Sequence, residues 1–155
     1  MSLNIDHTFL FQDGLWVAAG TFIDKDNNAI PVEGSNRIMH TEGLWLNKGY
    51  MKLLMPDGKA IELQNNYRIT PFESGKLSTV WESHNPSLGK LFGKFVVVDD
   101  SIISTFTSEN NEFSGAEYLL RISDINYRAR GFAMQGSTRL SSWSAELLRT
   151  NQALH

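Results

Sequence analysis

The sequence predicts an all-β fold, a single antiparallel up-and-down β-barrel of about ten strands. Short runs rich in β-branched and aromatic residues alternate along the chain with clusters of Gly, Pro, Asn and Asp, the pattern of strands joined by tight turns. Nearly every connection is too short for a crossover helix, so successive strands should pair antiparallel. A closed meander leaves no unpaired edge, which favours a barrel over a two-sheet sandwich. The 155 residues fit one domain, 1–155.

The predicted strands follow the apolar alternation from one turn signal to the next. They span residues 14–24, 29–42, 44–55, 59–70, 76–84, 90–98, 101–108, 116–123, 126–135 and 137–149. Pro56-Asp57-Gly58 is typical of a tight hairpin, because Pro fixes φ and Gly accepts a positive φ. Before the first strand, Ile5 to Phe11 could form a short helix that acts as a lid or plug of the barrel.

Composition excludes several classes of protein. The 14 Lys and Arg nearly balance the 17 Asp and Glu, giving a net charge of −3, which argues against nucleic-acid or anionic-membrane partners. The absence of cysteine excludes disulfides, thiolate zinc sites and thiol catalysis. No apolar run is long enough to span a membrane, and the N-terminal residues lack the features of a signal peptide. We therefore expect a soluble, cytoplasmic protein.

The predicted inward faces mix bulky apolar side chains with polar ones. Because side-chain direction alternates along a strand, one face collects the following residues: Trp45, Asn47, Asn65, Tyr67, Trp81, Arg139, Ser141 and Trp143. A solid core would seldom contain so many polar groups, since each unpaired one costs about 1–3 kcal/mol. Ten strands also make a barrel wider than the roughly eight strands that side chains can fill. We expect an internal cavity lined by these residues.

Two short motifs resemble those of the calycin superfamily, which includes lipocalins, fatty-acid-binding proteins and nitrobindin-like haem barrels. They are Gly14-Leu15-Trp16 on the first strand and Arg149 near the end of the last. The resemblance implies a lipocalin-like barrel in which Trp16 plugs the closed end and Arg149 packs across its ring. Small bacterial lipocalin-like or nitrobindin-like proteins fit best. The lipocalin Thr-Asp-Tyr signature is absent, and no helical lid fits between the first two strands.

Arginines on the last two predicted strands are the candidate residues for binding a ligand. The resemblance to intracellular fatty-acid carriers implies that Arg and Tyr on late strands hold an acidic head group. The nearest matches are Arg139 and the Tyr127-Arg128-Ala129-Arg130 run. Arginine suits a carboxylate, because its planar fork donates two parallel hydrogen bonds and stays protonated. The alternative is that these arginines are exposed on a solvent face.

Histidines and catalytic motifs give weaker signals. No cofactor is predicted from the residues, but nitrobindin-like barrels bind haem through one imidazole, and His84 and His40 are the candidate ligands. No pair of histidines or carboxylates has the spacing of a zinc site, so no metal site is predicted. No Gly-x-Ser-x-Gly elbow is present. Tyr67, His40 and Glu42 are the candidate acid–base groups if the barrel is an enzyme.

Three functions follow from this interpretation. The first is a carrier or sensor, without enzymatic activity, that binds a small and largely apolar molecule inside the barrel. Arg139, together with Asn47, Asn65 or Ser141, would hold the acidic or polar end of that molecule. The second is a small isomerase, cyclase or hydratase that acts on an apolar metabolite in the same cavity. The third is haem binding in the nitrobindin manner. Exposed apolar residues in the Asn85–Gly93 loop also allow a homodimer.

Overall fold

The structure is a computed structural model that describes residues 6–151, and within that range it contains ten strands and no helix. No described segment, in consequence, forms an apolar helix of the length needed to cross a membrane. The strands are β1 (Gly14–Ile23), β2 (Ala29–Thr41), β3 (Leu44–Leu54), β4 (Ala60–Ile69), β5 (Ser78–Asn85), β6 (Gly89–Val98), β7 (Ser101–Ser108), β8 (Phe113–Ser123), β9 (Asn126–Gln135) and β10 (Thr138–Thr150).

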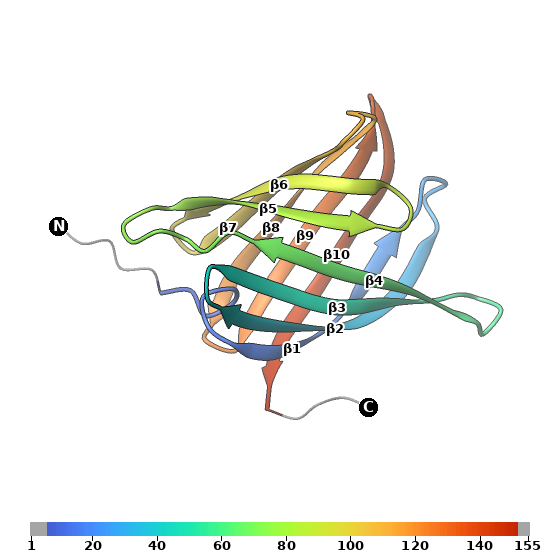
Figure 1. Ribbon diagram of the computed structural model, residues 1–155. Helices are drawn as coiled ribbons and strands as arrows, with labels where there is room; N and C mark the ends of the chain where they lie inside the picture. Colours follow the sequence, from blue (N-terminus) through green and yellow to red (C-terminus); the bar gives the residue numbers. More distant parts are fainter. Residues whose placement is uncertain (1–5, 152–155) are drawn as a thin grey trace.

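The strands close into one antiparallel barrel (Figure 1). Each strand pairs with the strands before and after it in the chain, and β1 pairs with β10 to complete the ring. This confirms the predicted up-and-down barrel. The contact between β4 and β5 is the shortest in the ring, with paired residues only from Tyr67–Ser83 to Ile69–Trp81.

Tight turns join the strands as the sequence predicts. Between β3 and β4, the N–H of Gly58 donates to the carbonyl of Met55 at 3.0 Å, and Gly58 has a φ of 85° that glycine tolerates well. Between β1 and β2, Oδ1 of Asp24 accepts hydrogen bonds from the N–H groups of Asp26 and Asn28. These local bonds set the hairpins without longer connections.

The segment before β1 is a turn, so the helix suggested for residues 5–11 is wrong over its described part. One helix-like bond is present, from the N–H of Gln12 to the carbonyl of Thr8 at 3.1 Å. Leu10 has a φ of 70°, a left-handed conformation that stops a helix from continuing. The segment instead folds against one end of the barrel, where Phe9 and Leu10 are buried.

The barrel therefore has two unlike ends. We call the end of the barrel that residues 7–13 cover the closed end. The turns at this end join β2 to β3, β6 to β7 and β8 to β9. The main apolar core, which includes Trp16, Ile38 and Tyr127, lies toward this end. A smaller cluster of Ile30, Val32 and Leu53 lies at the opposite end, between β2 and β3.

Candidate ligand-binding site inside the barrel

The closed end is packed around Trp16. Its indole is 1% exposed and meets the rings of Phe9 and Tyr127 edge-on, with centroid distances of 5.3 and 5.6 Å. Such edge-to-face pairs are favoured by the ring quadrupoles. Trp16 thus plugs the barrel, as the calycin resemblance implies.

Hydrogen bonds fasten the N-terminal segment to this plug. Nδ1 of His7 lies 2.7 Å from the Tyr127 hydroxyl, and Nε2 lies 2.9 Å from the carbonyl oxygen of Asp99. A neutral ring protonated on Nε2 satisfies both contacts, since Nε2–H donates to Asp99 and the Tyr127 hydroxyl donates to Nδ1. The same hydroxyl accepts from the N–H of Thr8 at 3.2 Å. Burial lowers the pKa of His7, which favours the neutral form.

Arg149 reaches the closed end in a different way from the one the resemblance implies. It is the direct cross-strand neighbour of Trp16, but its guanidinium lies against Gly14, where an added Cβ would be 3.0 Å from Nε. Nη1 donates to Oε1 of Gln12 and Nη2 to the carbonyl of Asp13, both at 2.7 Å. Within residues 6–151, the cations that lie over aromatic rings are Lys52, over Tyr50, and Lys90, over Phe92. Arg149 does not lie over a ring in this range. Gly14 is therefore the residue that makes room for the arginine.

Trp45 and His40 also belong to the closed end. Their rings stack with a centroid distance of 3.9 Å and an interplanar angle of 3°. Nε2 of His40 bonds to the carbonyl of Leu10 at 2.7 Å, so the imidazole holds the N-terminal segment. The edge of Phe11 meets Trp45 at 5.7 Å. Trp45 faces inward as predicted, but this packing places it beside the plug.

At mid-barrel, aromatic rings lie flat against the inner wall. Each ring covers an inward-facing glycine on a neighbouring strand, which has no side chain to lift the ring away. The pairs are Trp81 on Gly93, Phe106 on Gly115 and Trp143 on Gly131, where an added Cβ would come within 2.1, 2.5 and 2.4 Å of the ring. Trp81 is buried, but Phe106 and Trp143 are only half-buried although they face the interior. Their partial exposure means that solvent reaches these two rings.

Glu117 on β8 places a carboxyl group beside these rings. It faces inward between Ser104 and Gly131 in the neighbouring strands, and its Oε2 accepts a 2.6 Å hydrogen bond from Nε1 of Trp143. Burial raises its pKa, and the Trp143 bond partly opposes that shift. Within residues 6–151, nothing donates to the other oxygen, Oε1. Glu117 is nevertheless half-buried rather than fully covered, so it borders an internal space.

Tyr67 on β4 lies across the lumen from Glu117. Burial raises the pKa of its hydroxyl, and the charge of Glu117 raises it further, so the two groups are electrostatically coupled. The ring of Tyr67 meets Trp81 edge-on at 5.0 Å, and Nε1 of Trp81 donates to Oγ of Ser104 at 3.1 Å. Tyr67 and Trp81 therefore both border the interior, as the alternation predicts.

The predicted polar side chains differ in how far they are already paired. Asn47 is 6% exposed, and its Oδ1 accepts a 2.9 Å hydrogen bond from Nδ2 of Asn36. Asn65, opposite Gly49, and Ser141, opposite Ala133, face inward and are half-buried. Asn65 and Ser141 are thus the more accessible of the three.

The arginines lie elsewhere. A bulge between Arg139 and Ser141 reverses the alternation, so Arg139 pairs with Met134 instead of sharing the inward face of Ser141 and Trp143. Its Nη2 donates to the carbonyl of Asp24 at 2.9 Å and to Oδ1 of Asn27 at 2.7 Å, across the β1–β2 turn. The predicted inward direction of Arg139 is therefore wrong, and its contact with a ligand stays a prediction.

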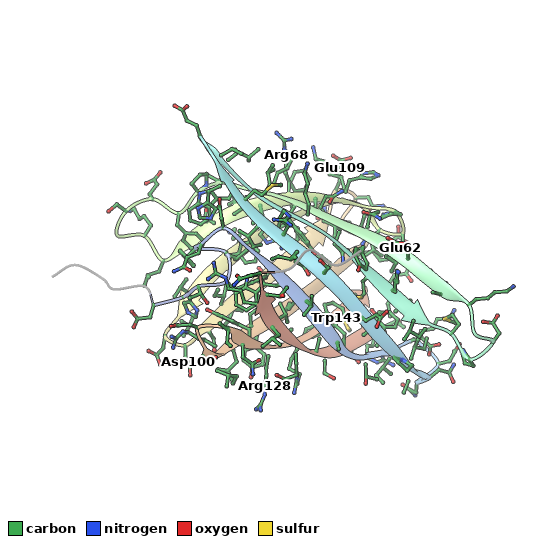
Figure 2. The ribbon with its side chains drawn as sticks, turned by 90° about the horizontal axis from the view of Figure 1, so that it is seen from below. Glu62, Arg68, Asp100, Glu109, Arg128 and Trp143 are labelled. Atoms are coloured by element: carbon green, nitrogen blue, oxygen red, sulfur yellow. The ribbon has the colours of Figure 1, made fainter. Side chains whose placement is uncertain are left out.

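Arg128 and Arg130 alternate with the buried Tyr127 and Ala129, which places both arginines on the outer face. Arg128, labelled in Figure 2, projects from the edge of the barrel. Its Nε lies 2.9 Å from Oε1 of Glu146. Arg130 is exposed and donates to the carbonyl of Ala129 at 2.8 Å. Neither guanidinium borders the lumen. Contact of Arg130 with a ligand inside the barrel also stays a prediction.

The described histidines do not fit haem ligation inside the barrel. His84 is exposed on β5, both nitrogens of His7 are bonded, and Nε2 of His40 is bonded to Leu10. Haem needs an imidazole directed into an apolar pocket. Across residues 6–151, no group of three or more His, Asp or Glu could hold a metal ion. Glu42, the third acid–base candidate, is exposed in the β2–β3 turn.

The sequence analysis missed Glu117. The sequence did contain an indication of its position. Glu117 lies two residues from both Gly115 and Leu119, so alternation places the three residues on one face of the strand. The opposite face of the strand contains Ala116, Tyr118 and Leu120, so neither face of this strand is clearly polar. Hydrophobic alternation alone therefore could not assign the carboxylate to the interior.

A hollow of about 740 Å³ lies along β4–β7. It is lined by Leu44, Arg68, Thr70, Val80, Trp81, Glu82, Phe92, Gly93, Lys94, Thr105, Phe106 and Thr107, of which Trp81, Gly93 and Phe106 belong to the inner face of the barrel. In Figure 2, Arg68 lies at the opposite edge of the barrel from Arg128, with Trp143 between them. This hollow is the alternative place for a ligand.

Comparison with known proteins supports the fold and leaves the function open. No family model and no curated protein matches the sequence. Among solved structures, the chain is similar to an S-type phycobiliprotein lyase from Guillardia theta, with a TM-score of 0.50, 8% identity, and coverage of 90% of this chain and 89% of that one. An AttH-like protein from Nitrosomonas europaea matches with a TM-score of 0.36 and 11% identity, over 99% of this chain and 57% of that one. The likeness to the Guillardia theta structure supports the barrel fold alone.

Proposed function

We propose that the protein binds a small, largely apolar molecule inside the barrel, as a carrier or sensor. One observation supports this most: Phe106, Glu117, Ser141 and Trp143 face the interior yet are only half-buried. A close-packed core would cover such side chains fully. The calycin-like fold adds support, since the similar structure from Guillardia theta is a phycobiliprotein lyase. A bilin is therefore one of the ligands to try.

A pair of neighbouring serines on β10 offers a matched test. Ser141 faces inward beside Ala133, whereas Ser142 faces outward beside Phe132. Ser141→Phe should obstruct the lumen, and Ser142→Phe adds the same ring to the outer surface. Acridine, a planar neutral probe, should bind the wild type and Ser142→Phe equally and bind Ser141→Phe at least about tenfold more weakly, in a fluorescence titration. Equal binding by all three proteins would place the probe outside the barrel and contradict the proposal.

Proton-transfer catalysis is the second candidate, in the form of an isomerase, cyclase or hydratase. The observation that favours it is Glu117, a carboxyl group with a raised pKa next to an accessible space. Its test is to incubate a metabolite extract in D₂O with wild type or Glu117→Gln and to compare deuterium incorporation by mass spectrometry. Incorporation by the wild type alone supports catalysis, and identical spectra contradict it.

A further inference from the structure

The half-buried rings and the carboxyl group form one continuous surface. Gly115 and Glu117 share the inner face of β8, and Gly131 lies directly beside Glu117 on β9. Because Phe106 covers Gly115 and Trp143 covers Gly131, two flat ring faces flank the carboxylate. A planar ligand lying on either ring would have its edge near Oε1 of Glu117.

Glu117 has no cationic partner within the part of the chain that the structure describes. The ion pairs formed there are His40–Asp13, Arg68–Glu82, Arg121–Asp124 and Arg128–Glu146. The hydrogen bond from Trp143 is neutral and occupies only Oε2. A carboxylate in a desolvated site is stable when a cation or a strong donor meets it. A ligand that enters the lumen can supply such a partner.

We propose that the ligand is a planar conjugated molecule with a cationic N–H group, which lies along Trp143 and Phe106 and donates to Oε1 of Glu117. This rests on the proposed function and names its ligand class. Both features select the same chemistry, because an aromatic face attracts cations and planar rings, and a carboxylate accepts from N–H donors. An acidic ligand would instead be repelled by Glu117. The inference thus differs from the acidic group expected from the late arginines.

Three compounds that share one ring skeleton but differ in charge separate the effect of ligand charge on binding from the effect of ligand shape. 9-Aminoacridine is a cation with N–H donors near neutral pH, acridine is neutral without them, and acridine-9-carboxylate is an anion. We expect the wild type to bind 9-aminoacridine at least about tenfold more tightly than the other two at pH 7.5. Glu117→Gln should weaken the binding of 9-aminoacridine about 10- to 100-fold and change the affinity for acridine less than about twofold. Glu146→Gln on the outer face of β10 is the matched control and should change neither.

A second measurement uses only the wild type, in case Glu117→Gln does not fold. If a cation draws Glu117 into its ionised form, binding releases a proton, whereas acridine binding releases none. Calorimetry at pH 7.5, where acridine is neutral, in two buffers of different ionisation enthalpy measures this release. Proton release with 9-aminoacridine alone supports the inference.

The outcomes distinguish the ligand class from the proposed function. Equal affinity of the wild type for the three compounds, tighter binding of the anion, or an unchanged affinity of Glu117→Gln for 9-aminoacridine would overturn the ligand class. Lumen binding, shown by the loss of acridine affinity in Ser141→Phe, would still stand. If none of the three compounds binds the wild type, both proposals fail.

Discussion

The closed end and the middle of the barrel use the same kinds of residue for opposite purposes. At the closed end, Trp16 is buried between Phe9 and Tyr127, and His7 and the N–H of Thr8 form hydrogen bonds with the Tyr127 hydroxyl. At mid-barrel, Trp143 lies flat on Gly131 and donates to a carboxyl group that borders open space. One tryptophan fills the barrel, and the other leaves it accessible.

The difference shows how this fold separates stability from binding. Edge-on ring contacts fill volume, so the closed end provides most of the core. Flat rings over glycine lie against the wall, and Phe106 and Trp143 stay partly exposed there. Glu117 adds a desolvated carboxyl that lowers stability, as functional groups often do.

Replacement of the two tryptophans should have unequal effects on folding. Trp16→Ala leaves a cavity in the closed end and should lower the free energy of unfolding by about 3–5 kcal/mol. Trp143→Ala enlarges a space that is already accessible and should cost only about 1–2 kcal/mol. Urea denaturation of both variants measures the difference. Equal losses would mean that mid-barrel is a packed core.

Tyr127→Phe should weaken the closed end without affecting binding. It removes the hydroxyl shared by His7 and the N–H of Thr8, leaving buried polar atoms unpaired, so unfolding should become easier by about 1–3 kcal/mol. Urea denaturation measures the loss. Acridine affinity should stay within about twofold. A large loss of affinity would show that the two regions are coupled.

Glu117→Gln should stabilise the protein at pH 8 by about 0.5–2 kcal/mol. The pKa of Glu117 is raised in the folded state, so the wild type loses stability as pH rises from the ordinary value of 4.5 through the folded-state pKa. The variant lacks this loss, and its advantage should disappear near pH 4.

His7 acts in the opposite direction. Its pKa is lowered, so stability falls as pH drops below 6.5, equally in the wild type and in Glu117→Gln. The difference between the two proteins across urea titrations at several pH values therefore isolates Glu117. A variant less stable than the wild type at pH 8 would show that the carboxylate has a partner in the folded protein.

Arg128→Ala should have the smallest effect. Arg128 and Glu146 form an ion pair on the outer face with about half of each side chain exposed, 51% and 52%. Such pairs contribute about 0.2–1 kcal/mol. Thermal unfolding should therefore change little, and probe affinity should not change. A clear loss of probe affinity would mean that the outer face takes part in binding.

The sequence predicted the barrel well because alternation and turn signals are local. Predicted and observed strand bounds differ by at most three residues, the largest difference being the start of β8 at Phe113 instead of residue 116. The predicted inward direction of Arg139 was wrong because the alternation of apolar and polar residues does not reveal a β-bulge. The suggested helix failed because Leu10 adopts a left-handed φ fixed by tertiary packing. Glu117 was missed because both faces of its strand include apolar residues.

A ligand should enter the lumen beside Trp143 and should not reach Trp16. The indole N–H signals in a ¹⁵N–¹H correlation spectrum, assigned by Trp→Phe variants, test it directly during a titration with 9-aminoacridine. The account predicts that the Trp143 signal shifts, because its Nε1 donates to Glu117, while the Trp16 signal stays in place. A saturating probe that leaves Trp143 unchanged, or that shifts Trp16 instead, would contradict the account.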